Sequence, residues 1–394
     1  MLKRNREALY FGEDIFFDRM MSDWNIRTLD MRQASLFYVP VWAVHHLNNI
    51  AFVKNFYHYQ SLVNWTQTDA DFRATWAGGA NAASHVFWFA GDKGACLLPR
   101  GPIFIAHWGL SVPWKYMIHV PESWRADAVE RRAHRTNNRV DDFAEAPCAD
   151  DLTIIAPPMC KSTSCKEPTA YQPALMRAKP SYDYELLFAG MPTFVNRSSS
   201  FCLNPNSPGA LLFEDTQMPP RAKGSFQRCY SQGVRELVFW HHANRSRFLI
   251  ARRANDTAFS RSRFCLAPSG EGFGDRIAKS MLLGCVPLII QPNVRQPLDD
   301  VLPYADFSLR MEIRDIPHLH ELLPRVSESE HARLLRGVAS YAAAFDWTHK
   351  GKAYEYVRYL LCLRAHRAVS GASADSWCAH LAPNTTHAHS THRT

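Results

Sequence analysis

The strongest constraint on the fold is the stretch from residue 263 to residue 291, RFCLAPSGEGFGDRIAKSMLLGCVPLIIQ. A strand pattern (FCLAP) leads into a glycine-rich loop, then into a helical pattern that ends at Gly284, then into an apolar run over residues 285–290. Glycine tolerates the positive φ that ends many helices, and an unbroken apolar run is typical of a strand covered on both faces. The stretch therefore predicts a βαβ unit of a parallel sheet.

The same unit predicts a binding site for a phosphate group. Gly270, Gly272 and Gly274 would let the backbone approach a ligand, and the helix that follows would present unpaired N–H groups to it. Arg276 falls at the start of that helix, and its planar guanidinium can form charge-assisted hydrogen bonds with phosphate. The spacing fits neither a Walker loop nor the GxGxxG of a dinucleotide fold, so an ordinary flexible turn is the alternative interpretation.

Further strand patterns alternate with helical patterns on both sides of a polar, proline-rich stretch at residues 157–180. A chain of 394 residues is long enough for two domains, and this alternation favours α/β domains with parallel sheets. We predict strands at 35–41, 85–91, 103–109, 151–158, 185–190, 263–268, 286–291 and 306–312, and helices at 42–65, 231–242, 328–345 and 351–366. We expect a first domain at 1–178, a second at 179–367, a long loop at 191–228 and a disordered tail, rich in Ser, Thr, His and Ala, at 368–394.

Composition and charge narrow the class of protein. Apolar residues make up 46% of the chain and charged residues 21%, which is the mixture of a folded soluble protein. Lys and Arg number 45 against 37 Asp and Glu, and no basic stripe stands out, so nucleic-acid binding is disfavoured. No apolar run approaches the roughly 18 residues of a membrane span. The first residues lack the apolar core of a signal peptide, so we expect either no secretory route or a missing N-terminus.

Ten cysteines are too few for a disulfide scaffold and many for an ordinary cytosolic chain. Cys160 and Cys165 lie close together in a polar loop, where they are either bridged or two free thiols. Five Asn-x-Ser/Thr sites occur, at Asn64, Asn196, Asn244, Asn255 and Asn384. They favour the secretory route weakly, since chance alone supplies some of them.

An ordered set of motifs resembles the exostosin-like glycosyltransferases, glycosyltransferase family 47. FCLAPSG, followed by an Arg and then by GCVPLII, is similar to the family's Phe-Cys-Leu-x-Pro-x-Gly, Arg and Gly-Cys-Ile/Val-Pro segments. IRTLDMRQASLFYVPV, HVFWFAGDKGAC, AHWG, LLFAG, SQGVR and QPLDDVLPYADFSLRM resemble other segments of the family in the same order. The resemblance covers roughly residues 27–347.

The resemblance implies a GT-B fold, in which two Rossmann-like domains with parallel sheets face a central cleft. It implies an inverting transferase that moves a sugar from a nucleotide sugar, expected to be a UDP-sugar, to a polysaccharide or glycoprotein acceptor. No metal or other cofactor is expected beyond the donor itself. The family implies the Golgi lumen or membrane, and complexes with a related glycosyltransferase are a further expectation, although this sequence shows no N-terminal anchor.

The resemblance also suggests roles in donor binding. We expect Arg276, and after it Arg235, to stabilise the departing diphosphate, with a surface ion pair as the structural alternative for each. Asp299, in QPLDD, stands where the family has a Glu and would accept hydrogen bonds from ribose, unless it only caps the next turn. Ser269 and Gly270 would line the nucleotide through their backbone groups.

The general base that deprotonates the acceptor hydroxyl should lie in the first domain. Asp92 follows the HVFWFAG strand, His85 begins it, and His107 belongs to AHWG. Each has a side chain capable of accepting a proton, and each has a structural alternative: a turn cap for Asp92 and hydrogen bonds to the backbone for the histidines. The sequence does not choose among them.

Two departures from the family pattern bear on activity. Ala83 and Ser84 stand where the family commonly has Arg-Asp before the histidine, and Lys279 stands where it often has Asp. These changes motivate a second hypothesis, a catalytically silent GT-B protein that binds glycan or scaffolds an active relative. A Rossmann dehydrogenase is disfavoured because no GxGxxG with a downstream acidic residue occurs.

Overall fold

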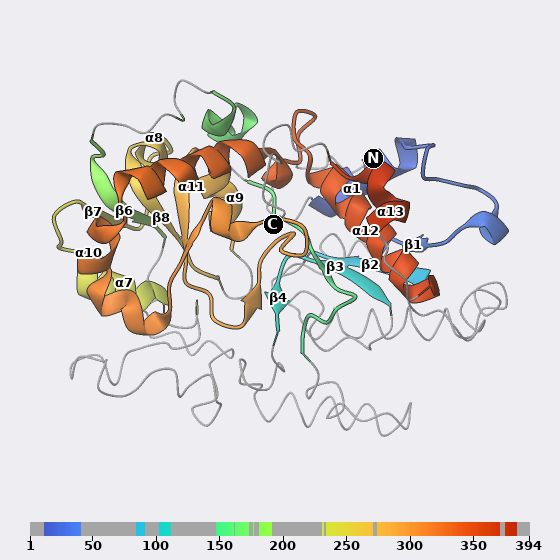
Figure 1. Ribbon diagram of the computed structural model, residues 1–394, viewed down its shortest axis with the longest axis horizontal. Coiled ribbons are helices and arrows are strands. Elements are labelled where there is room, and N and C mark those ends of the chain that lie inside the picture. The colour runs from blue at the N-terminus through green and yellow to red at the C-terminus, as the bar shows by residue number, and fades with distance from the viewer. Residues whose placement is uncertain are drawn as a thin grey trace, which may run out of the picture.

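A computed structural model gives the architecture of the chain (Figure 1). The residues it describes are 12–40, 84–90, 102–111, 147–160, 162–172, 176, 181–190, 231, 234–270, 274–370 and 375–383. These residues form an α/β structure with two parallel sheets, as the alternating sequence pattern predicts. The predicted helix at 42–65 and the predicted loop at 191–228 lie outside the described residues.

The first sheet is built from short, buried, apolar strands. Its order is β1-β2-β3-β5, and every neighbouring pair is parallel. The strands are β1 (Phe37–Val39), β2 (His85–Phe89), β3 (Ile103–Ala106) and β5 (Ile154–Ile155). All residues of β2 and β3 are buried, which explains why HVFWF and IFIA lack the alternation of a half-exposed strand. The four strands predicted in this half are confirmed.

The second sheet has five strands in the order β11-β9-β8-β6-β7, again all parallel. They are β6 (Tyr184–Ala189), β7 (Phe248–Ala251), β8 (Ser262–Ala267), β9 (Val286–Ile289) and β11 (Leu309–Arg310). The four strands predicted in this half are confirmed as β6, β8, β9 and β11, whereas β7 was not predicted. Strand β7, which follows β6 in the sequence, pairs with one side of β6, and the next strand, β8, pairs with the other side. The direction of winding therefore reverses between β6 and β8.

Helices cover the second sheet on both sides. Figure 1 shows α7 (Val234–His242) and α9 (Arg276–Leu282) on opposite sides of the strands. Helix α9 packs against β8 and β9, whereas α7 packs against β7 and the 3-10 helix at Ile313–His318. The remaining helices are α1 (Gly12–Ser22), α8 (Thr257–Ser260), α10 (Leu319–Leu322), α11 (Glu328–Tyr341), α12 (Ala353–Ser370) and α13 (Asp375–Cys378). Among the described helices, none is long and apolar enough to cross a lipid bilayer.

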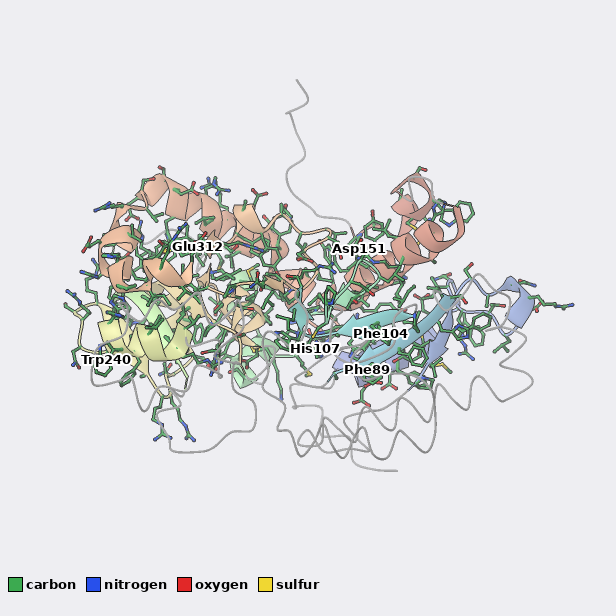
Figure 2. All side chains as sticks on the ribbon, turned by 90° about the horizontal axis from the view of Figure 1, so that it is seen from below. Phe89, Phe104, His107, Asp151, Trp240 and Glu312 are labelled. Atoms are coloured by element: carbon green, nitrogen blue, oxygen red, sulfur yellow. A yellow bond between two sulfur atoms is a disulfide. The ribbon has the colours of Figure 1, made fainter. Side chains whose placement is uncertain are left out.

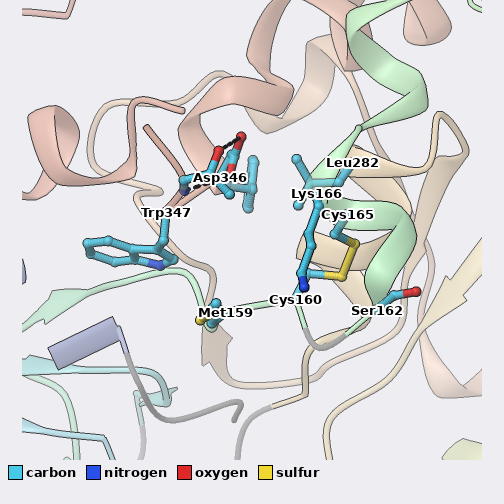
Figure 3. Close-up of a pocket in the computed structure, with 10 residues that line it drawn as sticks. Met159, Cys160, Ser162, Cys165, Lys166, Leu282, Asp346 and Trp347 are labelled. Carbon is cyan, nitrogen blue, oxygen red and sulfur yellow. Dashed lines mark hydrogen bonds between the residues drawn. A yellow bond between two sulfur atoms is a disulfide. The ribbon is translucent and has the colours of Figure 1, made fainter. Parts of the chain in front are cut away.

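Several contacts join the two sheets into one structure. Strand β10 (Val294–Arg295) pairs antiparallel with β4 (Gly109–Leu110), so a segment of the second half adds to the first. The buried indole of Trp347 donates a hydrogen bond to Pro157 O at 2.7 Å and lies edge-on to Trp88. A pocket beside this junction is lined by Trp347, Asp346 and the Cys160–Cys165 disulfide (Figure 3), but by none of the predicted site residues.

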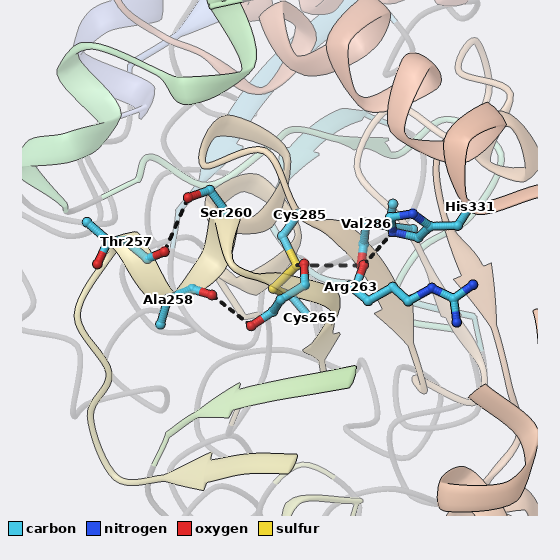
Figure 4. Close-up of a disulfide and its surroundings, with 9 residues drawn as sticks. Thr257, Ala258, Ser260, Arg263, Cys265, Cys285, Val286 and His331 are labelled. Atoms are coloured by element: carbon cyan, nitrogen blue, oxygen red, sulfur yellow. Dashed lines mark hydrogen bonds between the residues drawn. A yellow bond between two sulfur atoms is a disulfide. The ribbon is translucent and has the colours of Figure 1, made fainter. Parts of the chain in front are cut away.

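Disulfides cross-link the described residues at three places. One joins Cys160 to Cys165, which settles the alternative left open by the sequence, and one joins Cys265 of β8 to Cys285 just before β9 (Figure 4). The third, between Cys362 and Cys378, ties α12 to α13. The prediction of a disordered tail from residue 368 is therefore wrong at its start, since residues 368–370 and 375–381 are helical and held by this bridge.

Candidate functional site

The candidate site lies at the carboxyl ends of β6 and β8 in the second sheet. In open parallel sheets, ligands bind outside the carboxyl ends of the strands, at the place where the winding direction reverses. Gly190 directly follows β6, and Pro268, Ser269 and Gly270 directly follow β8. The glycine-rich loop that the sequence identified therefore emerges at the point where this topology places a ligand.

Arg235 fixes the start of that loop. It extends from the second residue of α7, is only 5% exposed, and donates from Nε and Nη2 to Ser269 O at 3.2 and 2.9 Å. Its guanidinium also lies 5.8 Å from the ring centroid of Phe188, near the end of β6. Arg235 and Ser269, predicted separately to bind the donor, are thus in direct contact. The two hydrogen bonds make Arg235 a residue that positions the loop.

Ser231 was missed by the sequence reasoning and belongs to the same cluster. Its backbone N–H donates to Gly270 O at 2.8 Å, and its hydroxyl accepts a hydrogen bond from the Arg235 N–H at 3.1 Å. Ser231 has a φ of 53°, a conformation that few residues other than glycine adopt. A serine just before a helical pattern is a capping signal, which is the one sequence clue that could have identified it.

Arg276 lies at the other end of the loop, as the first residue of α9. The two described ends of the loop approach each other closely, because a Cβ on Gly274 would lie 2.8 Å from Pro268 O. Arg276 Nε lies 3.7 Å from a carboxylate oxygen of Asp275 and, within the described residues, is buried with no hydrogen-bond partner. A buried donor without a partner is costly unless a ligand or water satisfies it.

The two carboxylate oxygens of Asp299 have different surroundings, and one of them could bind a ligand. One carboxylate oxygen accepts a hydrogen bond from the Gln296 N–H at 3.1 Å, which is the capping role that the sequence left open. The other oxygen is buried without a hydrogen-bond partner in the described part of the chain, 3.5 Å from Arg295 Nη2. Burial raises the pKa of this carboxyl, although the charges of Arg295 and Arg310 act in the opposite direction.

A second residue that the sequence reasoning missed lies on the same edge of the sheet. Gln291, just beyond β9, donates from Nε2 to Ala267 O at the end of β8, at 2.8 Å. This hydrogen bond holds the carboxyl ends of the two strands together directly behind the loop. No motif marks the glutamine, because its role depends on strand order and not on its neighbours in sequence.

The predicted bases of the first half are not brought together. His107 follows β3 at the carboxyl edge of the first sheet, near the end of β2 (Figure 2), whereas His85 begins β2 at the opposite edge, about 17 Å away by strand rise. His107 is 3% exposed, and its Nδ1 donates to Ala156 O at 2.9 Å. Burial lowers the pKa of His107 to about 4. His85 is fully buried and stacks on Phe37.

The surroundings of both histidines favour their structural interpretation over a role as base, and Asp92 lies outside the described residues. Of the departures from the family pattern, Ala83 also lies outside them, and Ser84 Oγ is 3.4 Å from His85 Nδ1. Lys279 forms an ion pair with Asp256 at 2.8 Å and lies over the ring of Phe259. The lysine is therefore neutralised inside the second half.

Known proteins resemble the chain over the region that contains this site. The family model for the exostosin GT47 domain matches residues 222–326. The chain is 23% identical over 318 residues to "Probable glucuronoxylan glucuronosyltransferase IRX7" of Arabidopsis thaliana, covering 80% of this chain and 60% of that protein. It is 23% identical over 320 residues to "Probable beta-1,4-xylosyltransferase IRX10L" of the same plant, covering 80% and 65%.

A shorter match reaches higher identity. A "Probable glucuronosyltransferase" of Oryza sativa subsp. japonica is 35% identical over 114 residues, which is 28% of this chain and 27% of that protein. The chain thus spans less than two thirds of the length of these three relatives. Its parallel α/β sheets are consistent with the GT-B fold of the matched family. The matched domain and the glycosyltransferase names of these relatives support a resemblance of the chain to the exostosin-like proteins of glycosyltransferase family 47.

Proposed function

We propose that the chain transfers a sugar from a UDP-sugar to a polysaccharide or glycoprotein acceptor, with inversion at the anomeric carbon. The observation that carries this proposal is the arginine-held loop at the β6/β8 reversal. Arg235 anchors the loop through Ser269 O, and the buried Nε of Arg276 remains without a hydrogen-bond partner among the described residues. Both arginines fall within the stretch that matches the exostosin domain.

The roles follow from the chemistry of the transfer. Departure of UDP leaves negative charge on the diphosphate, and positive groups fixed in advance stabilise that charge at little reorganisation cost. Arg276 would donate to the diphosphate, while Arg235 would hold Ser269 and Gly270 in place along the nucleotide. The carboxylate oxygen of Asp299 that has no hydrogen-bond partner among the described residues would accept a hydrogen bond from a ribose hydroxyl. No step of this proposal uses a metal ion.

The base is assigned to the first half of the chain. His107 is buried with a pKa of about 4, so it accepts a proton poorly near neutral pH, and His85 lies at the opposite edge of its sheet. Asp92 is therefore our preferred base. It follows β2 in the sequence, and the carboxyl end of a parallel strand is where substrate-facing groups lie.

The proposed location is the lumen of the Golgi apparatus. The described cysteines are all in disulfides, including Cys148, which is the state expected in an oxidising compartment. In the same compartment, a complex with a related glycosyltransferase is part of the proposal, and it can be sought by co-purification.

The proposal is tested by measuring free UDP released from a panel that includes UDP-glucuronic acid and UDP-xylose. We expect release from at least one donor. Arg276→Ala should lower kcat/KM by about ten- to a hundredfold, the effect of losing a hydrogen bond to a charged group. Arg314→Ala is the matched control, because Arg314 is exposed and pairs only with Glu312 among the described residues.

The same panel separates the enzyme from the silent alternative. If no donor is turned over and no UDP-sugar shifts the melting temperature, the chain is a glycan-binding or scaffolding protein and the proposal is wrong. If a donor shifts the melting temperature without turnover, donor binding stands and the missing element is the base or the acceptor. Asp92→Asn then shows whether the base has been assigned correctly.

A further inference from the structure

Among the strands that the structure describes, β7 forms an edge of the second sheet. This strand is last in the sheet order, and within the described residues no strand pairs with its outer side. Three of its four residues, Phe248, Leu249 and Ala251, are only partly buried. An exposed edge strand presents unpaired N–H and C=O groups that can pair with another chain, so natural proteins usually cover or blunt it.

Two of the Asn-x-Ser/Thr sites flank this edge strand. Asn244 is exposed in the turn between α7 and β7, and Asn255 is exposed in the turn between β7 and α8. One site therefore lies at each end of the four-residue strand. Nothing in the local sequence separates these two sites from the other three.

The local geometry leaves both side-chain nitrogens available. The Asn244 side chain makes no hydrogen bond with the described part of the chain, while the backbone of its turn is fixed by Arg245 N–H donating to His242 O at 3.0 Å. At Asn255 the carboxamide is held by its oxygen, which accepts hydrogen bonds from the N–H and the hydroxyl of Thr257. Nδ2, the atom that carries an N-linked glycan, takes no part in these bonds.

The disulfides indicate that the chain folds in an oxidising compartment, where N-linked glycosylation can also take place. Cys160–Cys165, Cys265–Cys285 and Cys362–Cys378 require an oxidising environment, such as the endoplasmic reticulum lumen. In eukaryotes the transfer of N-linked glycans takes place in that same lumen. A chain that has acquired these bridges there has therefore also been exposed to the glycosylation machinery.

We propose that Asn244 and Asn255 carry N-linked glycans, and that the two glycans shield the open edge of β7 from pairing with other chains. The co-substrate is a lipid-diphosphate-linked oligosaccharide. Asn Nδ2 forms a C–N bond to the anomeric carbon of the oligosaccharide, the bond from that carbon to the diphosphate oxygen breaks, and the amide proton leaves with the diphosphate. The occupancy of these sites is independent of whether the chain turns over a UDP-sugar.

Occupancy is tested on the full chain made in a eukaryotic secretory pathway. Peptide-N-glycosidase converts a glycosylated Asn to Asp, and mass spectrometry then reads each site. We expect Asp at positions 244 and 255 in the majority of molecules. Ser246→Ala and Thr257→Ala should abolish conversion at their own sites, whereas Ser246→Thr and Thr257→Ser, which keep the acceptor pattern, should not. Unconverted Asn at both sites, in protein whose disulfides have formed, would overturn the proposal.

The shielding role has a separate readout. Light scattering after size-exclusion chromatography should show that the Asn244→Gln/Asn255→Gln double variant self-associates as its concentration rises, while the wild-type protein keeps a constant mass. Enzymatic removal of the glycans from folded wild-type protein should produce the same change, which excludes a folding defect of the variant. If both sites are glycosylated and both unshielded forms keep a constant mass, the glycans do not protect the edge.

Discussion

The carboxyl edges of the two sheets use their polar side chains differently. On the second sheet, Arg235 and Gln291 donate to backbone carbonyls of the loop and strand beside them, which fixes a glycine-rich loop in place. Near its end, Arg276 keeps a buried N–H without a hydrogen-bond partner among the described residues. On the first sheet, the described polar group at the carboxyl edge, His107, donates to Ala156 O inside the core.

This difference shows that residue type alone does not identify a catalytic or ligand-binding residue. The loop that Arg235 anchors begins where the winding of its sheet reverses, which is where a ligand is bound in such folds. The histidines of the first sheet are packed among aromatic rings, where burial keeps His107 neutral. The second half thus keeps a buried arginine N–H without a hydrogen-bond partner among the described residues, whereas the described histidines of the first half are packed into the core.

The largest expected effect concerns the junction between the two halves. Trp347→Ala removes a 3% exposed indole together with its hydrogen bond to Pro157 O, so it should lower the free energy of unfolding by about 3 to 5 kcal/mol. Chemical denaturation measures this change. The matched control is Trp377→Ala, because that side chain is 69% exposed and should matter little. Equal losses from the two variants would show that Trp347 does not join the halves.

The second prediction tests whether His107 belongs to the core. Its pKa is about 4 in the folded state and near 6.5 when unfolded, so the unfolded chain takes up the proton first as the pH falls. This site should therefore lower the free energy of unfolding by roughly 2 kcal/mol between pH 7 and pH 5. His107→Asn keeps a donor for Ala156 O and should remove that part of the pH dependence.

His242, whose pKa is also lowered to about 4, would still contribute to the pH dependence in this variant. Denaturant unfolding at several pH values makes the comparison. If the free energy of unfolding of His107→Asn depends on pH as that of the wild-type protein does, His107 is not a buried neutral group. His107 would then again be a candidate for the general base.

The third prediction concerns the loop of the second half. Arg235→Lys keeps the charge but loses the planar pair of donors that holds Ser269 O, so UDP affinity should fall by about tenfold. Isothermal titration calorimetry with UDP measures the change. Arg314→Lys, made at an exposed arginine, should leave the affinity as it is. An unchanged affinity in Arg235→Lys would mean that charge alone, without the positioned loop, accounts for binding.

The smallest effect is expected at Asp299. Burial raises the pKa of this carboxyl, so its charged form is disfavoured, and Asp299→Asn should change the free energy of unfolding by less than about 1 kcal/mol. An Asn oxygen can still accept from Gln296 N–H and from ribose, whereas Asp299→Ala cannot. We therefore expect Ala, and not Asn, to weaken UDP binding. Equal binding by both variants would assign Asp299 to the turn alone.

Sequence reasoning predicted local structure well and long-range geometry poorly. The strands β8 and β9 and the loop between them were predictable, because apolar runs and glycines act within a few residues. The reversal between β6 and β8 depends on which strands pair, and no local pattern records that. Ser231 and Gln291 were missed for the same reason, since their partners are 39 and 24 residues away in sequence.

The limits of local sequence patterns have physical causes as well. His85 and His107 were candidates on the basis of residue type, but the depth of burial of a side chain follows from tertiary packing. The tail was predicted to be disordered from its composition, which does not reveal that Cys362 and Cys378 pair and hold α13 against α12. In both cases the structure depends on contacts between residues that are far apart in the sequence.

The proposed donor site requires that a nucleotide binds at the reversal between β6 and β8. Hydrogen–deuterium exchange with and without UDP tests it most directly, because it reports where protection appears. If UDP binds there, backbone amides in peptides that span α7 and the β8–loop–α9 segment should exchange more slowly with UDP than without it. Arg276→Ala should abolish this slowing. Protection confined to β2 and β3 of the first half, or no protection at a saturating UDP concentration, would contradict it.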